Sequence, residues 1–150
     1  ILHLDVKTSN AMYSDGHVTL IDLSVAKEFD PEEPFKDNAG TRDYMAPEQT
    51  AREDVGYATD VYGLGVVFYR LLTGGEMPYG TVEVESDETD EPPTKQLDYD
   101  SPPVFPSEVN EDVPVEISEV AMRAVALDPE DRYATPAEFK AALLEAFDSG

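Results

Sequence analysis

The segment from Thr59 to Leu72 is apolar on nearly all of its faces, and it constrains the fold more than any other part of the chain. Apolar side chains recur there at helical spacing, namely Val61, Leu64, Phe68 and Leu71, with Val67 and Leu72 beside them. The opposite face carries no charge and presents Gly63, Gly65 and Val66. A helix without a polar face is buried at the centre of a fold. The sequence therefore predicts a mainly α-helical protein built around this helix, with close backbone packing that offsets the low helix propensity of the glycines.

A short hairpin and a long loop precede this helix. Two strand-like runs, 11–13 and 18–21, flank a turn sequence that contains Asp15 and Gly16. Residues of this kind between two such runs predict a β-hairpin. Residues 22–45 lack sustained periodicity and are punctuated by proline and glycine, so we expect a long surface loop there.

Helices also close the chain, after a stretch that breaks the pattern. Residues 80–114 contain a nearly continuous acidic run, 83–91, followed by several prolines, so we expect an acidic, proline-rich insertion that is a loop or partly disordered. Beyond it, periodicity predicts helices at 115–127 and 135–147, the second opening with a capping box at Thr135. The buried face of that last helix is expected to carry Phe139, Leu143 and Phe147.

The charge balance excludes several classes of protein. The chain has 33 Asp and Glu against 10 Lys and Arg, a formal net charge of −23. This excess argues against a nucleic-acid binder or a polybasic membrane module, because both present positive charge to phosphate. An acidic chain can be disordered, but this one has clear helical periodicity. We therefore favour a carboxylate-rich surface adapted to a salt-rich, halophilic cytoplasm, where such charges are screened.

The absence of cysteine excludes a disulfide scaffold, a Cys-ligated zinc site and a cysteine nucleophile. No apolar run approaches about 18 residues, and nothing at the amino terminus has the pattern of a signal peptide. We therefore expect a cytoplasmic location and no membrane segment in this chain. Because the first residue is Ile1 rather than methionine, we also expect the chain to begin inside a longer reading frame.

Four polar residues early in the chain have the chemistry of phosphoryl transfer, namely Asp5, Lys7, Asn10 and Asp22. The first three precede the expected hairpin and the fourth follows it, so the four side chains can converge on one small volume. Carboxylate and amide oxygens suit Mg²⁺, a lysine suits a phosphate oxygen, and a free carboxylate can accept a hydroxyl proton. For any single aspartate in so acidic a chain, an ordinary surface role is the better interpretation. For the four together, phosphoryl transfer is the better one.

Five motifs in order along the chain resemble those of eukaryotic-type protein kinases. His3 to Asn10 is similar to the catalytic loop H-R-D-x-K-x-x-N, and 22–24 is similar to the D-F-G motif. Residues 40–48 resemble the end of an activation segment that closes in A-P-E. Residues 59–65 resemble the start of the family's central helix, and 127–133 resemble the loop before its final helix. The chain is identified as a member of the Hanks-type serine/threonine protein kinase family, in its prokaryotic branch.

The resemblance implies a role for each residue of the site. Asp5 would orient the substrate hydroxyl and accept its proton, and Lys7 would contact the transferred phosphoryl group. Asn10 and Asp22 would hold magnesium. Thr41, in the activation segment, would brace the catalytic loop beside the substrate. The implied cofactors are ATP and Mg²⁺, and the implied partner is a protein substrate.

Other residues would support this site from behind. Glu48 would form an ion pair with Arg132, which we expect to be buried rather than a surface pair of little value. Asp60 would accept hydrogen bonds from the backbone of the catalytic loop. His3 belongs to the same supporting set, and Leu23 would fill the apolar stack that phenylalanine fills in D-F-G.

Two departures from the family pattern affect regulation. Leu4 stands where an arginine usually pairs with a phosphorylated activation loop, which puts control by phosphorylation of that loop in doubt. Ser24 stands where D-F-G has glycine, and serine is restricted where glycine is free to adopt positive φ.

The resemblance covers nearly all of the chain but only part of the family's domain. The catalytic loop 3–10, the activation segment 22–48 and the central helix 59–72 all belong to the carboxy-terminal lobe. The family's glycine-rich loop and its strand lysine are not found, so the amino-terminal lobe (N-lobe) is absent from this chain. We therefore expect the missing N-lobe to be a partner from the same polypeptide and the isolated chain to be inactive.

Three functions follow from these observations. The first is ATP- and Mg-dependent phosphoryl transfer to serine or threonine hydroxyls of proteins, with this chain as half of the kinase domain. The second is a pseudokinase remnant that acts as a non-catalytic interaction module, which the departures at Leu4, Leu23 and Ser24 favour. The third, a calcium-binding protein, is weak because the acidic run 83–91 lacks the turn glycine of a calcium loop.

Overall fold

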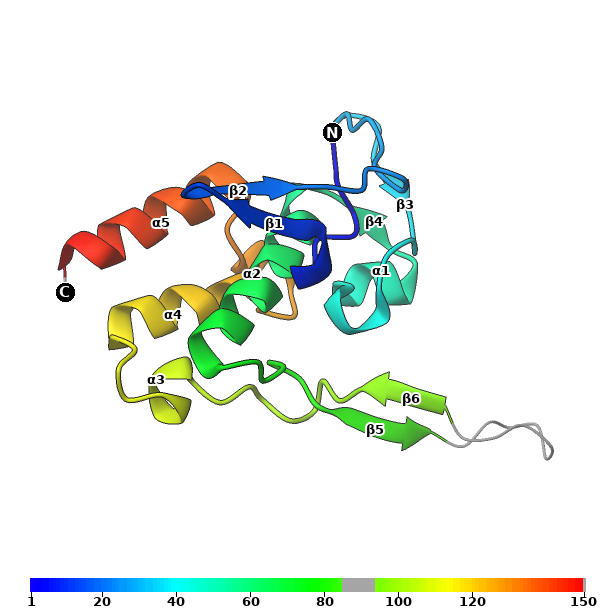
Figure 1. Cartoon of the computed structure of the whole chain (residues 1–150). Coiled ribbons are helices and arrows are strands. Elements are labelled where there is room, and N and C mark those ends of the chain that lie inside the picture. The colour runs from blue at the N-terminus through cyan, green and yellow to red at the C-terminus, as the bar shows by residue number, and fades with distance from the viewer. Residues whose placement is uncertain (85–93, 150) are drawn as a thin grey trace.

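Helix α2 (Tyr57–Thr73) runs through the middle of the molecule, and the other elements pack around it (Figure 1). The computed structural model describes residues 1–84 and 94–149. The other α-helices in this part of the chain are α1 (Pro47–Ala51), α3 (Pro106–Val109), α4 (Val115–Ala124) and α5 (Pro136–Ser149). The prediction of a mainly helical protein is confirmed, and the helix expected at 59–72 is present with slightly wider bounds.

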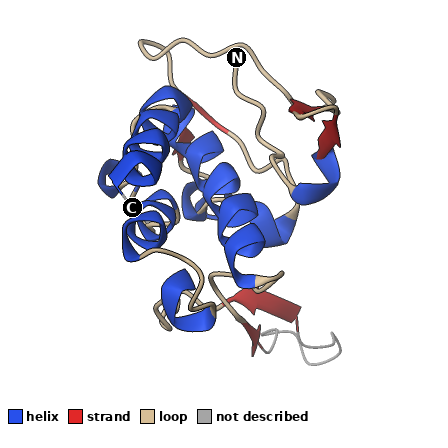
Figure 2. Ribbon diagram, turned by 60° about the vertical axis from the view of Figure 1, so that its left-hand side comes forward, coloured by secondary structure: helices blue, strands red, loops and turns tan. Residues whose placement is uncertain are grey.

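The main core lies where α4 and α5 pack against α2. Figure 2 shows the helices gathered together, with the short strands outside the group that they form. Its fully buried members include Val61, Ile117 and Ala124. Gly65 makes the contact between α2 and α4 possible, because a Cβ at this position would lie 2.8 Å from the Cβ of Ala124. The expected close backbone packing is therefore observed, and it compensates for the low helix propensity of glycine.

Two apolar positions expected to be buried are exposed. Leu71 of α2 is 72% exposed and Phe147 of α5 is 62% exposed. Phe139 is buried and Leu143 packs against the same core, so the start of the predicted face of α5 is correct. The faces of α2 and α5 that carry Leu71 and Phe147 have little covering within the described residues, which is why periodicity alone overestimated their burial.

The expected hairpin is present as β1 (Ala11–Ser14) and β2 (His17–Leu20), which pair antiparallel from Ala11–Leu20 to Ser14–His17. Asp15 and Gly16 both adopt positive φ, 51° and 82°, as a two-residue turn of this twist requires. Most side chains of both strands are exposed to solvent, so the hairpin lies on the surface of the fold.

The long loop after the hairpin has little regular structure, as expected, but it is anchored at two points. Residues 35–36 form β3 (Phe35–Lys36), which pairs with β4 (Asp54–Val55). The side chains of Phe29 and Phe35 pack against a small buried cluster that contains Leu2, Leu4 and Val55. A 3₁₀ turn, η2 (Arg42–Tyr44), follows and leads into α1.

The insertion 80–114 is more regular than the sequence indicated. It contains an antiparallel pair, β5 (Thr81–Val84) and β6 (Thr94–Leu97), and the short helix α3. Pro106 occupies the first turn of α3, where its missing N–H costs nothing. The remainder of the expected acidic run, 85–91, lies outside the described residues. None of the helices within the described ranges has the length and apolar character needed to cross a lipid bilayer.

Candidate active site

Asp5 is the centre of a dense group of polar contacts at the start of the chain. Its Oδ1 accepts hydrogen bonds from the backbone N–H of Thr41 at 2.8 Å and from the Thr41 hydroxyl at 2.7 Å. Its Oδ2 lies 2.8 Å from Lys7 Nζ. The Asn10 amide donates to Oδ2 at 3.3 Å and to the Asp5 carbonyl at 3.0 Å. Both carboxylate oxygens are thus oriented by neighbours from two segments of the chain.

These contacts keep the Asp5 carboxylate ionised. Burial alone would raise its pKa, but the hydrogen bonds from Lys7 and Thr41 and the charge of Lys7 outweigh burial, so the pKa lies below its ordinary value. Its side chain is 12% exposed, which leaves a small part of it accessible to another molecule. An oriented, accessible carboxylate is suited to accept a proton from a hydroxyl group placed against it.

Lys7 and Thr41 join the catalytic-loop segment 3–10 to the long loop after the hairpin. Lys7 Nζ donates to the Thr41 hydroxyl at 2.7 Å as well as pairing with Asp5. The Lys7 side chain is 22% exposed, and its ammonium group lies against the partly exposed carboxylate of Asp5. When the two groups lie side by side, the carboxylate can accept a proton from a hydroxyl group while the ammonium group binds a phosphate oxygen.

Asn10 and Asp22 offer the oxygen ligands that a magnesium ion prefers. The Asn10 Nδ2 group donates to Asp5, so Asn10 Oδ1, the acceptor atom of the amide, lies on the other side of the group. Hydrogen bonds from the hydroxyl and N–H of Ser24 lower the pKa of Asp22, so this exposed carboxylate is also ionised. The backbone holds the two residues near each other, because Ile21 N–H donates to the Asn10 carbonyl at 2.8 Å.

Mg²⁺ usually takes one or two protein carboxylates or amides and completes its shell with water and phosphate oxygens. The Asn10 and Asp22 pair fits that pattern. No group of three or more His, Cys, Asp or Glu side chains suited to a metal occurs within residues 1–84 and 94–149. Asn10 and Asp22 would therefore supply two ligands, and other oxygens would have to complete the shell of an ion bound there.

Asp60 holds the catalytic-loop segment from below. Its two carboxylate oxygens accept the backbone N–H groups of His3 at 2.7 Å and Leu4 at 2.8 Å. Burial raises the pKa of Asp60, although the two N–H groups act in the opposite direction. His3 is also buried, and its ring bridges the Asp5 N–H and the Ile21 carbonyl at 3.3 and 3.2 Å. Asp60 and His3 thus both form direct hydrogen bonds to the backbone of the catalytic-loop segment.

Leu4 adopts a strained backbone conformation beside Asp5. Its φ is +64°, a region that a bulky non-glycine residue rarely occupies. The Asp60 carboxylate binds its N–H, and its side chain is 4% exposed in the small cluster with Leu2 and Val55. At the position where the family pattern has arginine, this chain therefore places an apolar anchor for the loop that carries Phe29 and Phe35.

Glu48 and Arg132 form a buried, bidentate ion pair. Arg132 donates from Nη1 and Nη2 to the two Glu48 oxygens, both at 2.8 Å, and it is 2% exposed. Its remaining N–H groups donate to the carbonyls of Ala58, Ala126 and Leu127. Thr59 adds a hydrogen bond to Glu48 at 2.9 Å. Every guanidinium donor has a partner, which is the arrangement that makes burial of an ion pair tolerable.

The structure does not bring Leu23 into the site. Its side chain is 65% exposed, so it fills no apolar stack within the described residues. The positive φ in this segment falls on Asp22, at +64°, and not on Ser24. The substitution of serine for glycine therefore causes no backbone strain at Ser24.

Sequence reasoning missed Gln49, which lies in α1 and is 2% exposed. It follows Glu48 in the A-P-E motif, and its amide binds backbone groups on both sides of the site. Sequence patterns could not predict this role, because the partners of Gln49 are backbone atoms of Leu4, Ala39 and Ala46, and backbone atoms do not depend on residue type.

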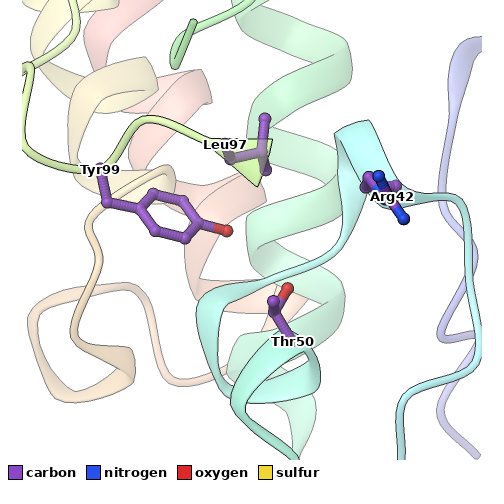
Figure 3. Close-up of a pocket in the computed structure, with 4 residues that line it drawn as sticks. All are labelled: Arg42, Thr50, Leu97 and Tyr99. Atoms are coloured by element: carbon purple, nitrogen blue, oxygen red, sulfur yellow. The ribbon is translucent and has the colours of Figure 1, made fainter. Parts of the chain in front are cut away.

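Two shallow hollows lie beside Thr41. One has a volume of about 380 Å³ and is lined by Arg42, Thr50, Leu97 and Tyr99. Figure 3 shows the Tyr99 hydroxyl directed toward the side of this hollow that Arg42 and Thr50 line. The other, about 410 Å³, shares Arg42 and Thr50 and extends to Asn38, Gly40, Met45 and Arg52.

Comparison with known proteins agrees with this geometry. Residues 1–143 match the family model described as protein kinase domain. The chain is 34% identical over 151 residues to the serine/threonine-protein kinase PknB of Mycobacterium leprae, covering 96% of this chain and 22% of the relative. It is 37% identical over 153 residues to the serine/threonine-protein kinase Pkn1 of Myxococcus xanthus, covering 95% of this chain and 21% of the relative.

Among solved structures, the kinase PK-1 of Cydia pomonella granulovirus is similar, with a TM-score of 0.68 and 23% sequence identity. The match covers 95% of this chain and 50% of that chain, and it shows a kinase-like fold. The chain thus spans about a fifth of the length of the curated relatives and half of the solved kinase. These proteins give no support to a halophilic source, which stays a prediction.

Proposed function

The chain belongs to the protein kinase domain family, and from this premise we propose that it forms the carboxy-terminal lobe of a serine/threonine protein kinase. In this role it transfers a phosphoryl group from ATP to serine or threonine hydroxyls of a protein substrate. The observation that carries the proposal is the Asp5 group, in which an ionised carboxylate, an ammonium and a hydroxyl contact one another within 2.8 Å.

Asp5 accepts the proton of the substrate hydroxyl group. The hydroxyl oxygen forms a bond to the γ-phosphorus of ATP, and the bond between that phosphorus and the leaving nucleoside diphosphate breaks. Thr41 fixes the direction of the carboxylate through two hydrogen bonds to Oδ1. Lys7 places a positive charge beside the transferred group, where negative charge is spread over phosphate oxygens. Because the activation segment supplies Thr41, the site is complete only when that segment lies against the catalytic loop.

Asn10 Oδ1 and the Asp22 carboxylate are the residues that would hold Mg²⁺. When bound, the ion supplies charge stabilisation and orientation to the phosphates. The low pKa of Asp22 supports this role, because the carboxylate is available as a ligand without losing a proton.

An exposed apolar surface supports a second part of the proposal, that the N-lobe of the same polypeptide covers this chain. On the hairpin and the segment after it, the side chains of Met12, Tyr13, Val18 and Leu23 are 57 to 74% exposed. Tyr13 and Val18 are directly paired across the hairpin and so share one face, and exposed apolar side chains that lie together mark an interaction surface. The solved kinase is twice as long as its match to this chain, so a further half-domain is available to cover it. We therefore expect no kinase activity from the 150 residues alone, and the cytoplasmic location stays a prediction.

The second candidate is a pseudokinase remnant that binds a partner without catalysis. The exposure of Leu23 and the replacement of arginine by Leu4 favour it. The intact set of Asp5, Lys7 and Asn10 favours the kinase instead, since a non-catalytic module has no need to keep an ionised carboxylate braced by three neighbours.

The test is phosphoryl transfer by the longer polypeptide that contains this chain, with labelled ATP and Mg²⁺ and identification of the phosphorylated amino acid. We expect label on serine or threonine and a loss of about 10²- to 10⁴-fold in rate for Asp5→Asn. The matched control is Asp15→Asn, in the hairpin turn, where asparagine is equally suited to the positive φ. Equal rates for wild type and Asp5→Asn, or no transfer by either, would exclude the kinase proposal.

A further inference from the structure

Gln49 connects the two backbone segments that meet at Asp5. Its Nε2 donates to the Leu4 carbonyl at 3.1 Å and to the Ala39 carbonyl at 2.7 Å, while its Oε1 accepts the Ala46 N–H at 3.0 Å. The amide orientation follows from these partners, because only the NH₂ group can face two carbonyls. The side chain is 2% exposed, so no water competes for these contacts.

The Leu4 and Ala39 carbonyls, which Gln49 binds, belong to the two backbone segments that determine the position of Asp5 and of its partner Thr41. Leu4 O is part of the peptide bond that leads into Asp5, and Ala39 lies two residues before Thr41, which binds Asp5 Oδ1 twice. Between Ala39 and Thr41, Gly40 passes so close to the catalytic loop that a Cβ would lie 2.6 Å from Leu4 O. Gln49 thus joins the two segments beside a point where their backbones approach closely.

The Leu4 peptide units are held from both sides. Asp60 binds the Leu4 N–H at 2.8 Å, and Gln49 binds its carbonyl. With a φ of +64°, Leu4 needs such contacts to stay in a conformation that its side chain disfavours. Asp60 fixes the catalytic loop to α2, whereas Gln49 fixes it to the activation segment.

We propose that Gln49 is a positioning residue for the proposed phosphoryl transfer, which acts through the Leu4 and Ala39 carbonyls to keep Thr41 bonded to Asp5. It touches no reacting atom. Its loss releases the activation segment from the catalytic loop and lengthens the two Thr41 hydrogen bonds to Asp5. This inference rests on the proposed function only for its kinetic consequence, because the contacts themselves can be measured without activity.

The test compares Gln49→Glu and Gln49→Met in the longer polypeptide. Glutamate keeps the shape but sets a carboxylate oxygen against two carbonyls, and methionine keeps the volume without the amide. The matched control is Asn110→Asp, since the Asn110 amide also bridges backbone groups, donating to Leu72 O at 3.0 Å and accepting from Asp112 N–H at 3.1 Å.

Two measurements are made on each variant. In hydrogen exchange we expect peptides containing Thr41 to exchange at least about tenfold faster in the Gln49 variants, with α4 peptides unchanged. In kinetics we expect kcat to fall about 10- to 100-fold at constant KM for ATP, since small displacements at a reacting centre have effects of this size. Faster exchange confined to the Thr41 peptides, with α4 as protected as in wild type, distinguishes a positioning role from a general loss of folded protein.

The outcomes separate the two proposals. Faster exchange at Thr41 with an inactive wild type shows that Gln49 holds Thr41 against Asp5, but it excludes the kinase function and with it the kinetic part of the inference. An active wild type whose kcat and exchange are unchanged by Gln49→Glu and Gln49→Met overturns the positioning role. Should α4 also exchange faster in Gln49→Met, that variant has unfolded, and Gln49→Asn, which keeps the amide one methylene back, takes its place with the same expected results.

Discussion

On the side of the catalytic loop that faces α2, polar groups are buried and paired, whereas on the side that faces the hairpin, apolar groups are left in solvent. The inner side includes Asp60 with two N–H partners and the Glu48–Arg132 pair with all donors satisfied. The outer side includes Tyr13, 74% exposed, and Leu23, 65% exposed. The chain therefore provides buried, paired polar groups on one side of the site and leaves the opposite side uncovered. We call the buried polar side, with Asp60, Glu48 and Arg132, the floor of the site.

This difference separates what the 150 residues achieve alone from what requires more polypeptide. The floor residues come from segments far apart in the sequence, yet all of their hydrogen bonds close within this chain. The outer apolar residues have no comparable partners among the described residues. Substitutions on the two sides should therefore respond differently to the presence of the rest of the domain.

The largest effect is expected at the buried ion pair. Arg132→Met leaves the Glu48 carboxylate buried without its charge partner, which should lower the free energy of unfolding by about 3–5 kcal/mol. The matched control is Arg52→Met, in which an exposed arginine four residues after Glu48 is replaced and a change within about 0.5 kcal/mol is expected. Denaturant unfolding of both variants measures the difference; equal losses would mean that the pair contributes no more than a surface charge.

The exposed face of α2 that carries Leu71 should respond to substitution only when it is covered. Leu71→Ala should change the stability of the 150-residue chain by less than about 0.5 kcal/mol, because the side chain is 72% exposed. In the longer polypeptide the same substitution should cost about 2–5 kcal/mol if the preceding residues bury it. Val61→Ala, at a fully buried position of the same helix, is the control that should destabilise both forms. Identical effects of Leu71→Ala in the two forms would show that nothing covers this face.

The two carboxylates of the loop should give opposite pH dependences. The folded pKa of Asp5 lies below 3.8, so its stabilisation is present above that pH and is lost as the pH falls through the folded pKa. The folded pKa of Asp60 lies above 3.8, so its pH-linked stabilisation is present below that value and is lost as the pH rises through the folded pKa.

Unfolding free energies between about pH 6 and about pH 3.5 check this linkage. As the pH falls, the difference between wild type and Asp5→Asn should shrink, and the difference between wild type and Asp60→Asn should grow. Parallel trends for the two variants would contradict the opposite shifts.

The smallest effect is expected from salt. A net charge of −23 repels itself in dilute buffer and is screened as ionic strength rises, so the melting temperature should be higher in about 2 M KCl than in about 0.1 M KCl. The Glu48–Arg132 pair is shielded from ions by burial, so Arg132→Met should lose the same stability in both salts. A melting midpoint that is the same in both salts would remove the argument for salt adaptation.

Local patterns predicted the elements that local interactions form. The central helix followed from its apolar faces, and the hairpin followed from the turn at Asp15 and Gly16. The floor of the site was also expected, because the motifs that contain Asp5, Asp60 and Arg132 have recognisable residue types.

The sequence did not predict features that depend on contacts between distant residues or on whether another segment covers a helix face. Leu71 has the spacing of a core residue, but spacing does not reveal whether another segment covers that face. Gln49 binds the carbonyl of Leu4, 45 residues away, and backbone partners of this kind leave no trace in residue identity. The strands β5 and β6 were not predicted, because the acidic and proline-rich composition of the residues around them indicated a loop.

The most direct measurement is a titration of ATP with excess Mg²⁺ into the longer polypeptide, its Asp22→Ala variant and the 150-residue chain alone. If this chain is the floor of a kinase site, the longer polypeptide should bind saturably and Asp22→Ala should weaken binding at least about tenfold. The 150 residues alone should not bind at the same concentrations. Binding that Asp22→Ala leaves unchanged, or no binding by the longer polypeptide, would contradict the assignment of this site to phosphoryl transfer.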